Sequence, residues 1–319
     1  VMQRGVLVES GAADEVLERP CHPYTRALIA AVPPLAPAAS RHAVAADAPN
    51  ILTTQALSKT YRKRGWFGQP GRVTHALDDV TLALREGSTL GIVGESGSGK
   101  STLARSLLGL LAPDAGAITL AGDTVTFKGS RARREHARRV QMVFQDPYGS
   151  LNPRQRVGEI VARGPIVHGM PRREAWAQAR ELFELVGLSP DALRRYPHEF
   201  SGGQRQRVGL ARALAMRPRV LIADEPVSAL DVSVQAQVLA LLARLREQLG
   251  LSIVFITHDL RVAAQVCDHI AVMKNGQVVE QGPCAEVFAA PAHPYTRALL
   301  AAVPGRRWDS DAAAARQAA

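Results

Sequence analysis

The sequence has few cysteines and no long apolar run, and each of these shortages excludes one class of protein for this chain. Its three cysteines, Cys21, Cys267 and Cys284, lie far apart without a C-x-x-C pair, which predicts free thiols rather than a zinc site or a disulfide framework. No segment approaches the roughly 18 to 20 apolar residues of a membrane-spanning helix, and residues 1–30 carry charges where a secretory signal would be apolar. We therefore expect a cytosolic protein.

Lysine is also scarce, because it makes up only five of the 39 basic residues, although the net charge is +10. An excess of positive charge by itself would agree with binding to nucleic acid or to an anionic membrane surface. The densest arginine cluster, within residues 131–139, has no aromatic side chains between the arginines that could stack on bases. A solvated helix face is the favoured interpretation, and no nucleic-acid partner is expected.

One segment occurs twice: residues 1–33 align without gaps on residues 272–304, and 20 of the 33 positions are identical. An offset of 271 residues is the size of a whole domain, whereas a solenoid repeats every 20 to 50 residues. We interpret residues 1–33 as a remnant of the C-terminal tail of a preceding, similar domain, with translation from a GTG codon at Val1 as the alternative. His22 and His293 each begin a His-Pro-Tyr-Thr-Arg copy, which predicts a turn, then a short helix, and a packing role for the histidine.

Residues 34–50 are rich in proline and alanine and are expected to form a linker. From residue 51, short apolar runs alternate with segments of helical period, which is typical of a mainly parallel sheet with helices on both faces. The expected strands are 51–61, 80–84, 90–93, 140–144, 220–223, 253–256 and 270–273, with a glycine-rich loop at 62–74. The expected helices are 100–110, 172–186, 204–216, 232–248 and 261–266, with shorter helices between about 146 and 200.

The string Gly-Glu-Ser-Gly-Ser-Gly-Lys-Ser, residues 94–101, fits the phosphate-loop pattern G-x-x-x-x-G-K-[ST]. Its glycines let backbone N–H groups surround the phosphates of a nucleotide, Lys100 reaches the outer phosphates, and Ser101 holds Mg²⁺. The match is moderately specific by itself, but an apolar strand precedes it and a helical segment follows. The N-terminus of that helix also favours phosphate charge.

An apolar strand ends in two adjacent carboxylates at Asp224 and Glu225. Asp224 is expected to hold Mg²⁺, and Glu225 to orient or deprotonate the attacking water, because phosphoryl transfer needs positioning and charge neutralisation. A solvated acidic turn is the alternative, and the phosphate loop makes it the weaker one. Together the two motifs predict an enzyme that binds and hydrolyses a nucleoside triphosphate with Mg²⁺.

With Ser-Gly-Gly-Gln-Arg at 201–205, the chain resembles the ATP-binding subunit of an ABC transporter over about residues 51–304. The resemblance implies a P-loop NTPase fold, in which a RecA-like, mainly parallel sheet is joined by an antiparallel β subdomain and by a helical subdomain that bears the signature motif. It also implies that ATP lies between two such domains, each supplying its phosphate loop to one site and its signature to the other. Phe200, where leucine is commonest, and Val227, where threonine is frequent, depart from the family pattern.

The resemblance assigns roles residue by residue. Gln145 matches a glutamine that contacts Mg²⁺ or the attacking water, His258 matches a histidine that contacts the γ-phosphate, and Tyr61 matches an aromatic residue that stacks on adenine. Residues 228–231 match a loop that joins the two nucleotide sites of the dimer. The predicted catalytic residues are Glu225, His258 and Gln145, and the predicted metal ligands are Ser101, Gln145 and Asp224. The predicted nucleotide-binding residues are Tyr61, Gly94, Glu95, Ser96, Gly97, Ser98, Gly99, Lys100, Ser101, Thr102, Ser201, Gly202, Gly203 and Gln204.

Three segments, 144–154, 224–239 and 293–304, resemble the oligopeptide, dipeptide and nickel importer branch of the family, in which tandem fusions exist. Some relatives bind an iron–sulfur cluster in the tail through several cysteines, and Cys284 alone predicts none. We expect an ATP-binding domain over 51–282, with a helical subdomain at about 146–215, and a C-terminal extension over 283–319.

The expected partners are a second ATPase domain (a fused upstream domain or a second copy), permease subunits in the membrane and, indirectly, an extracytoplasmic solute-binding protein. The resemblance thus implies a peripheral place on the cytoplasmic face of the inner membrane and a role in importing peptides or a related solute such as nickel. The alternative is a soluble ABC-type ATPase that acts on nucleic acid or the ribosome.

Overall fold

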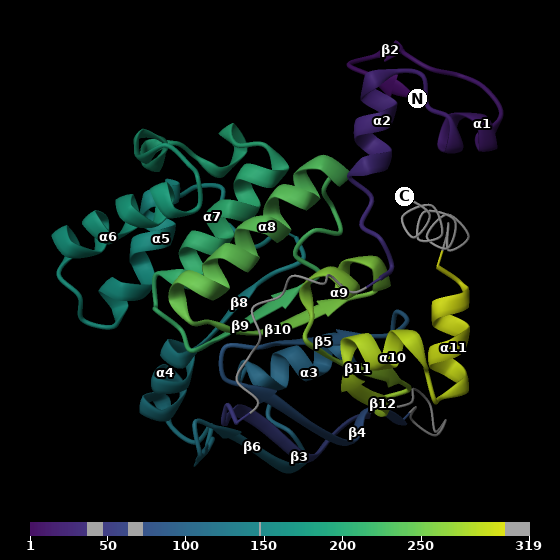
Figure 1. Ribbon diagram of the computed structural model, residues 1–319. Coiled ribbons are helices and arrows are strands. Elements are labelled where there is room, and N and C mark those ends of the chain that lie inside the picture. The colour runs from purple at the N-terminus through teal and green to yellow at the C-terminus, as the bar shows by residue number, and fades with distance from the viewer. Residues whose placement is uncertain (37–46, 63–72, 147, 304–319) are drawn as a thin grey trace, which may run out of the picture.

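The computed structural model describes residues 1–36, 47–62, 73–146 and 148–303. Its central element is a six-stranded sheet in the order β12-β11-β5-β10-β9-β8 (Figure 1). All neighbouring pairs in it are parallel except β11 and β12, which form an antiparallel hairpin at one edge. The strands are β5 (Thr89–Val93), β8 (Val140–Val143), β9 (Val220–Asp224), β10 (Ser252–Thr257), β11 (His269–Lys274) and β12 (Gln277–Pro283).

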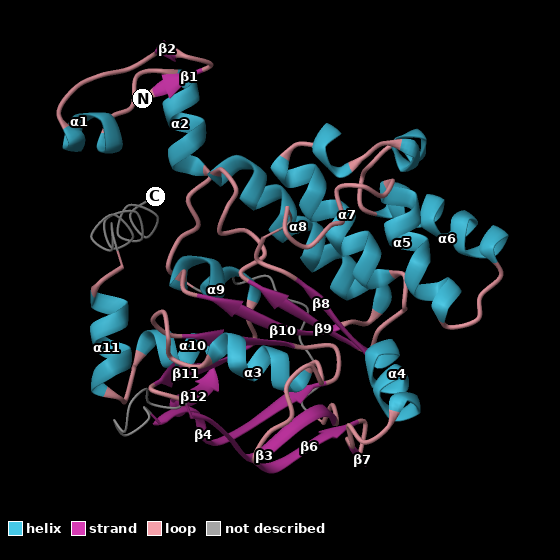
Figure 2. Ribbon diagram, turned by 180° about the vertical axis from the view of Figure 1, so that it is seen from behind, coloured by secondary structure: helices cyan, strands magenta, loops and turns pink. Residues whose placement is uncertain are grey.

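A second, antiparallel sheet of four strands lies beside the first in the order β4-β3-β6-β7. Its two long strands, β3 and β4, pair over most of their length and shift register at several positions. Figure 2 shows this sheet on one side of the molecule and most of the helices on the other. The strands are β3 (Asn50–Arg62), β4 (Val73–Arg85), β6 (Ala115–Leu120) and β7 (Asp123–Thr124).

The helices complete both faces of the six-stranded sheet (Figures 1 and 2). Helix α3 (Lys100–Leu107) packs between the two sheets, and α4 (Ser130–Arg139) precedes β8. The helices of the other face are α5 (Val157–Val167), α6 (Arg172–Leu185), α7 (Gly202–Leu214), α8 (Val232–Leu249), α9 (Leu260–Val266), α10 (Cys284–Ala289) and α11 (Pro294–Ala301), with short 3-10 turns at Pro190–Arg194 and Pro197–Glu199.

Two buried cores hold these layers together, and successive residues of a strand alternate between them. Leu221 and Phe255 point to the helical side, whereas Ile222 and Val254 point to the side of α3 and the antiparallel sheet. Strands that are apolar on both faces are expected for a parallel sheet covered on both sides, and every residue of β5 is buried. The predicted fold class is therefore confirmed.

The expected strands and helices are present, with ends that differ by a few residues, but several elements were not predicted. The strand expected at 80–84 is the second half of the longer β4, and residues 63–72 of the predicted loop lie outside the described residues. Strands β6 and β12 had no expected counterpart, whereas α4 agrees with the helix face expected at 131–139. As expected, most arginines of α4 are exposed to solvent. Among the described helices, none is long and apolar enough to cross a membrane.

The two copies of the repeated segment fold alike. Helix α2 (Pro23–Ala30) follows His22, and α11 follows His293; in each copy the histidine Nδ1 accepts a hydrogen bond of 3.1 Å from the tyrosine N–H two residues later. The predicted turn followed by a short helix is thus confirmed, and the histidines act as N-caps. Near the N-terminus, β1 (Met2–Gln3) pairs with β2 (Val6–Leu7), and α1 is Ala13–Glu18. Of the predicted linker, residues 37–46 lie outside the described residues.

Candidate functional site

Parallel strands bring the two sequence motifs to one edge of the central sheet. Thr257 at the end of β10 pairs with Val93 at the end of β5, and Ile256 pairs with Asp224 at the end of β9. Segments that follow these strands therefore lie next to each other, at the edge where open α/β sheets bind ligands. The phosphate loop, the Asp224–Glu225 pair and His258 meet there although up to 164 residues separate them in sequence, from residue 94 to residue 258.

Glycine is required at two positions of the phosphate loop because neighbouring backbone lies against it. Gly94 has φ +149°, and a Cβ there would overlap the carbonyl oxygen of Met273. Gly99 has φ +109°, and a Cβ there would lie 2.5 Å from the carbonyl oxygen of Ala76. L-residues with a Cβ rarely adopt such angles, so the sequence pattern here reflects backbone geometry. The loop ends at Gly99, the N-cap of α3, so that amide groups of the helix start face the site.

The ammonium group of Lys100 lies inside this loop. Its Nζ donates to the carbonyl oxygens of Gly94 and Glu95, both at 2.7 Å, and the side chain is almost fully buried. Burial lowers the pKa of Lys100, and the carboxylates of Glu225, Asp224 and Glu95 partly oppose that shift. An anion bound in the loop would stabilise the ammonium charge where it lies.

Glu225 connects the predicted catalytic residues. Its carboxylate accepts a 2.7 Å hydrogen bond from Gln145 Nε2, and its other oxygen lies 3.1 Å from His258 Nδ1. The backbone holds Glu225 at φ +44°, and its N–H donates to the Ile256 carbonyl at 2.9 Å. A non-glycine residue with positive φ is uncommon and is often found at functional sites. Glu225 therefore contacts both Gln145 and His258, which brings the three residues predicted to be catalytic together.

Asp224 and Glu225 place two carboxylates side by side at a partly buried position. Burial raises the pKa of Asp224, and the charge of Glu225 raises it further, against the opposing effect of Arg105 and Lys100. A divalent cation would relieve this repulsion. The oxygen donors predicted for Mg²⁺ (the Ser101 hydroxyl, the Asp224 carboxylate and the Gln145 amide oxygen) are of the hard type that Mg²⁺ prefers, so the residues fit the ion.

A cavity of about 540 Å³ opens over the phosphate loop. It contains part of the predicted nucleotide site together with Gln145 and Glu225. The residues that line it are Val73, Thr74, His75, Ala76, Ser96, Gly97, Gly99, Lys100, Ser101, Thr102, Gln145, Glu225 and Asn275.

Tyr61 and the signature lie outside this lining. Tyr61 is exposed on β3 and pairs with Thr74, which does line the cavity. Ser201 is the N-cap of α7 and forms a capping box with Gln204: each side chain accepts from the other residue's N–H, at 3.4 and 3.0 Å. Within the described part of the chain, residues 201–204 do not line the cavity that holds the phosphate loop.

Sequence reasoning missed the residues that line the cavity from outside the motifs. Thr74, His75 and Ala76 come from β4, and Asn275 from the turn between β11 and β12. That turn also supports the loop, because the N–H of Gly276 donates to the Ser98 carbonyl at 2.9 Å. The Asn275–Gly276 dipeptide between two extended runs is a hairpin signal that could have identified this turn.

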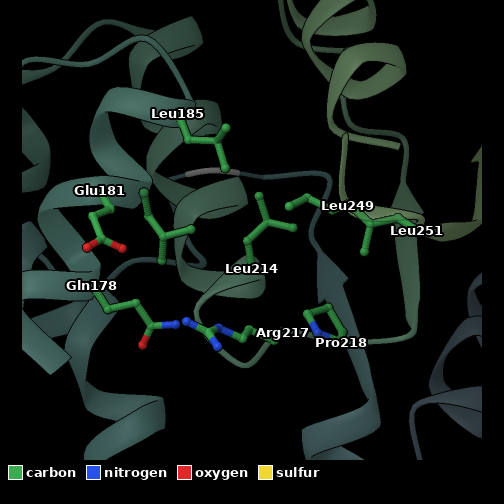
Figure 3. A pocket seen from close by; sticks show the side chains of 9 residues that line it. Gln178, Glu181, Leu185, Leu214, Arg217, Pro218, Leu249 and Leu251 are labelled. Atoms are coloured by element: carbon green, nitrogen blue, oxygen red, sulfur yellow. The ribbon is translucent and has the colours of Figure 1, made fainter. Parts of the chain in front are cut away.

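A second hollow, of about 490 Å³, lies far from the motifs, where α6 meets the C-terminal ends of α7 and α8 (Figure 3). Figure 3 shows the side chains of Leu185, Leu214, Leu249 and Leu251 around it, with Gln178 and Arg217 on one side. None of the described residues that line it belongs to a predicted motif.

Comparison with protein families agrees with this geometry. A model described as "ABC transporter" matches residues 77–228, which contain the phosphate loop, Gln145, the signature and Glu225. A model described as "Oligopeptide/dipeptide transporter, C-terminal region" matches two parts of the chain, residues 8–71 and 279–318, which include all but the first seven residues of each repeated segment.

Individual proteins are similar over most of the chain. The glutathione import ATP-binding protein GsiA of Escherichia coli O157:H7 is 42% identical over 328 residues, which are 95% of this chain and 53% of that protein. GsiA of Salmonella choleraesuis (strain SC-B67) is also 42% identical, over 329 residues, with the same coverage. The chain thus spans about half the length of the curated relatives it matches.

Solved structures share the fold. The ATP-binding cassette MJ0796, in a dimeric post-hydrolysis state bound to ADP and Pi, superposes with a TM-score of 0.64 at 30% identity, covering 73% of this chain and 98% of that one. The protein cbiO1 from Clostridium perfringens, part of the ABC transporter complex cbiONQ, gives a TM-score of 0.63 at 29% identity, covering 76% of this chain and 91% of that one.

The fold and the site together define a P-loop nucleotide-binding protein in which a phosphate loop, an adjacent pair of carboxylates and a helical signature are present in one chain. More particularly, the chain belongs to the ATP-binding proteins of ABC transporters, in the branch that carries the oligopeptide/dipeptide C-terminal region.

Proposed function

We propose that this chain hydrolyses MgATP at a site whose phosphate-loop half is the 540 Å³ cavity described above. The observation that carries the proposal is the contact of Glu225 with both Gln145 and His258 at the edge of that cavity. Two side chains that follow other strands, Gln145 after β8 and His258 after β10, thus both contact the carboxylate that follows β9. A solvated acidic turn, the alternative for this carboxylate pair, gives no reason for those contacts.

Each residue has a stated task in this proposal. The amides of residues 96–101 and the ammonium of Lys100 bind the phosphates, and Glu225 orients the attacking water and accepts its proton. Gln145 and His258 hold the Glu225 carboxylate in place. Ser101, Gln145 and Asp224 would hold Mg²⁺, which supplies charge neutralisation at the β- and γ-phosphates when it is bound.

We further propose that the signature of a second ATPase domain completes the nucleotide-binding site. This second domain is either a fused upstream domain or another copy of this chain. A ligand that contacts both domains favours their closed dimer, and loss of the γ-phosphate contacts releases it. The exposed position of Ser201, away from the chain's own phosphate loop, supports this arrangement.

The physiological process we propose is import of a peptide or a related small solute, such as nickel. The supporting finding is the match to the oligopeptide/dipeptide C-terminal region and to the GsiA proteins, whose named solute, glutathione, is itself a peptide. The chain would then act at the cytoplasmic face of the cell membrane, through permease subunits that receive solute from an extracytoplasmic binding protein. Residues of about 146–215 would transmit dimer closure to the permeases.

The proposed domain organisation follows from the repeat. Residues 1–33 are the tail of a preceding ATPase domain, 34–50 a linker, 51–282 the ATP-binding domain and 283–319 its extension. The match of one C-terminal-region model to both ends of the chain supports this division, as does the coverage of about half of the GsiA proteins.

Substitution of the phosphate-loop lysine tests the central claim. Lys100→Ala should lower MgATP hydrolysis by about 10²–10³-fold, because a charge aimed at the transferred phosphoryl group is lost. Lys128→Ala is the matched control, since Lys128 is exposed and lies outside the cavity. Steady-state phosphate release from the purified chain measures both, and a Lys100→Ala variant as active as Lys128→Ala would refute the assignment.

A further inference from the structure

The C-terminal extension reaches into the phosphate loop through one side chain. The hydroxyl of Tyr295, on α11, accepts a 3.2 Å hydrogen bond from the backbone N–H of Glu95, which lies 200 residues earlier in the chain. Tyr295 is 8% exposed, and the Lys274 ammonium lies 4.6 Å from the centre of its ring. The contact therefore forms in a largely desolvated position, where a hydrogen bond is electrostatically stronger than in water.

The backbone around Tyr295 is held independently of this hydroxyl. His293 caps α11, and the two carboxylate oxygens of Glu280, on β12, accept from the N–H groups of Ala292 and His293 at 2.7 and 3.0 Å. Since β12 pairs with β11, which is parallel to β5, the helix is tied to the strand that leads into the phosphate loop. Removing the hydroxyl alone would leave this framework intact.

The hydrogen bond acts on one particular peptide group. The peptide between Gly94 and Glu95 donates its N–H to Tyr295, and its carbonyl oxygen accepts from Lys100 Nζ at 2.7 Å. Gly94 has φ +149°, a conformation that glycine adopts freely, so nothing intrinsic to this residue prevents the peptide from rotating. By accepting from the Glu95 N–H, Tyr295 fixes the orientation of this peptide group. The direction of the Gly94 carbonyl, which accepts from Lys100, is fixed with it.

We propose that Tyr295 is a positioning residue of the ATP site, which couples the C-terminal extension to the phosphate loop by fixing the Gly94–Glu95 peptide. The inference rests on the proposed nucleotide role of that loop. By holding the loop in its open, phosphate-accepting shape before nucleotide arrives, the hydroxyl lowers the conformational cost of binding. It favours binding more than the chemical step, because it contacts neither the water nor the Glu225 group.

The hydroxyl remains able to serve this role at neutral pH. Burial raises the pKa of Tyr295 although the hydrogen bond from the Glu95 N–H opposes the shift, so the side chain is a neutral phenol whose oxygen accepts from that N–H.

The repeat supplies a matched control within the same chain. Tyr24 occupies the same position of the first copy, after the same capping histidine and with the same 3.1 Å N–H to Nδ1 contact. Among the described contacts of this chain, none joins Tyr24 to the phosphate loop. A substitution at Tyr24 therefore makes the same chemical change without touching the Glu95 amide.

The experiment compares Tyr295→Phe with Tyr24→Phe in the full chain. The dissociation constant for a magnesium complex of a non-hydrolysable ATP analogue is measured by titration calorimetry, and KM and kcat for MgATP by phosphate release. Loss of one hydrogen bond predicts that Tyr295→Phe raises the dissociation constant and KM about two- to tenfold, with kcat changed by less than about twofold. Tyr24→Phe should leave all three at the wild-type values.

Several results would overturn the inference. Equal or tighter analogue binding by Tyr295→Phe would show that the hydroxyl does not prepare the loop, and equal losses in both variants would indicate a general property of the repeated tail. A fall confined to kcat would place the effect on chemistry instead of binding. A wild-type chain that binds no nucleotide at all would refute the proposed function itself, and this inference with it.

Discussion

Replacing Glu225 by glutamine separates binding of the nucleotide from its hydrolysis. The carboxylate accepts from Gln145 Nε2 on one oxygen and lies against His258 Nδ1 with the other. In the Glu225→Gln variant the amide oxygen can still accept from Gln145, while its NH₂ group faces His258, whose ring nitrogen accepts a hydrogen bond when it carries no proton. The shape of the site is thus conserved, and only the proton acceptor is lost.

The magnitude follows from the task assigned to Glu225. Loss of a positioned general base lowers a rate by about 10²–10⁴-fold, which corresponds to about 2.7–5.4 kcal/mol of activation free energy. MgATP binding should survive because Lys100 and the loop amides are unchanged, so ATP should hold a stable dimer that the wild-type chain forms only transiently. Single-turnover hydrolysis and size-exclusion chromatography with MgATP measure the two effects.

The matched control is Glu181→Gln, because Glu181 lines the distant hollow of Figure 3 and not the nucleotide cavity. Hydrolysis by that variant should equal that of the wild-type chain. If Glu225→Gln hydrolysed MgATP within about threefold of the control, Glu225 would not be the residue that activates water, and the interpretation of its contacts with Gln145 and His258 would be wrong.

Two further substitutions test the metal site and the shared signature. Because burial and the charge of Glu225 raise the pKa of Asp224, the folded state binds this proton more tightly than the unfolded chain, and stability is lost as pH rises through the interval up to the raised pKa. Asp224→Asn should therefore raise the melting temperature of the nucleotide-free protein at pH 7, by an amount that becomes smaller as the pH is lowered. Hydrolysis should fall at least about 10²-fold. A melting temperature below that of the wild-type chain at pH 7 would contradict this reasoning. Ser201→Ala should be inactive alone, yet an equimolar mixture with Lys100→Ala should recover about a quarter of wild-type activity, since half of the dimers then contain one intact composite site. No recovery in the mixture would exclude a site shared in this way.

The parts of the site that could be predicted are those whose chemistry constrains the sequence locally. A loop that wraps phosphate needs glycine where the backbone of Met273 or Ala76 would meet a Cβ, so the spacing of Gly94 and Gly99 appears directly in the sequence. Continuous apolar runs identified β5, β9 and β10, because both faces of these strands are buried. Their parallel order then brought Asp224 and His258 to the same edge.

The parts that could not be predicted depend on contacts that leave no local pattern. Strand β6 has two exposed residues and one partly buried residue over its first half, with Gly116 among them, and therefore lacks the apolar run that marked the interior strands. Strand β12 is an edge strand of mixed composition with no fully buried residue. The hydrogen bond from Glu95 to Tyr295 joins residues 200 positions apart, and the repeated His-Pro-Tyr-Thr-Arg string at residue 293 predicted only a turn and a short helix.

The arrangement of the signature agrees with the proposal that ATP is shared between two domains. Helix α7 begins with Gly202 and Gly203, and a Cβ at Gly203 would overlap the Val234 side chain of α8, so glycine there lets the two helices approach closely. Exposed Ser201 caps the start of this 13-residue helix, where the positive end of the helix dipole lies. The cavity over the phosphate loop is open, and among the described residues that line it none belongs to the signature of the same chain. A γ-phosphate between two chains would satisfy both surfaces at once, which is why activity should depend on the partner's Ser201 as strongly as on the chain's own Lys100.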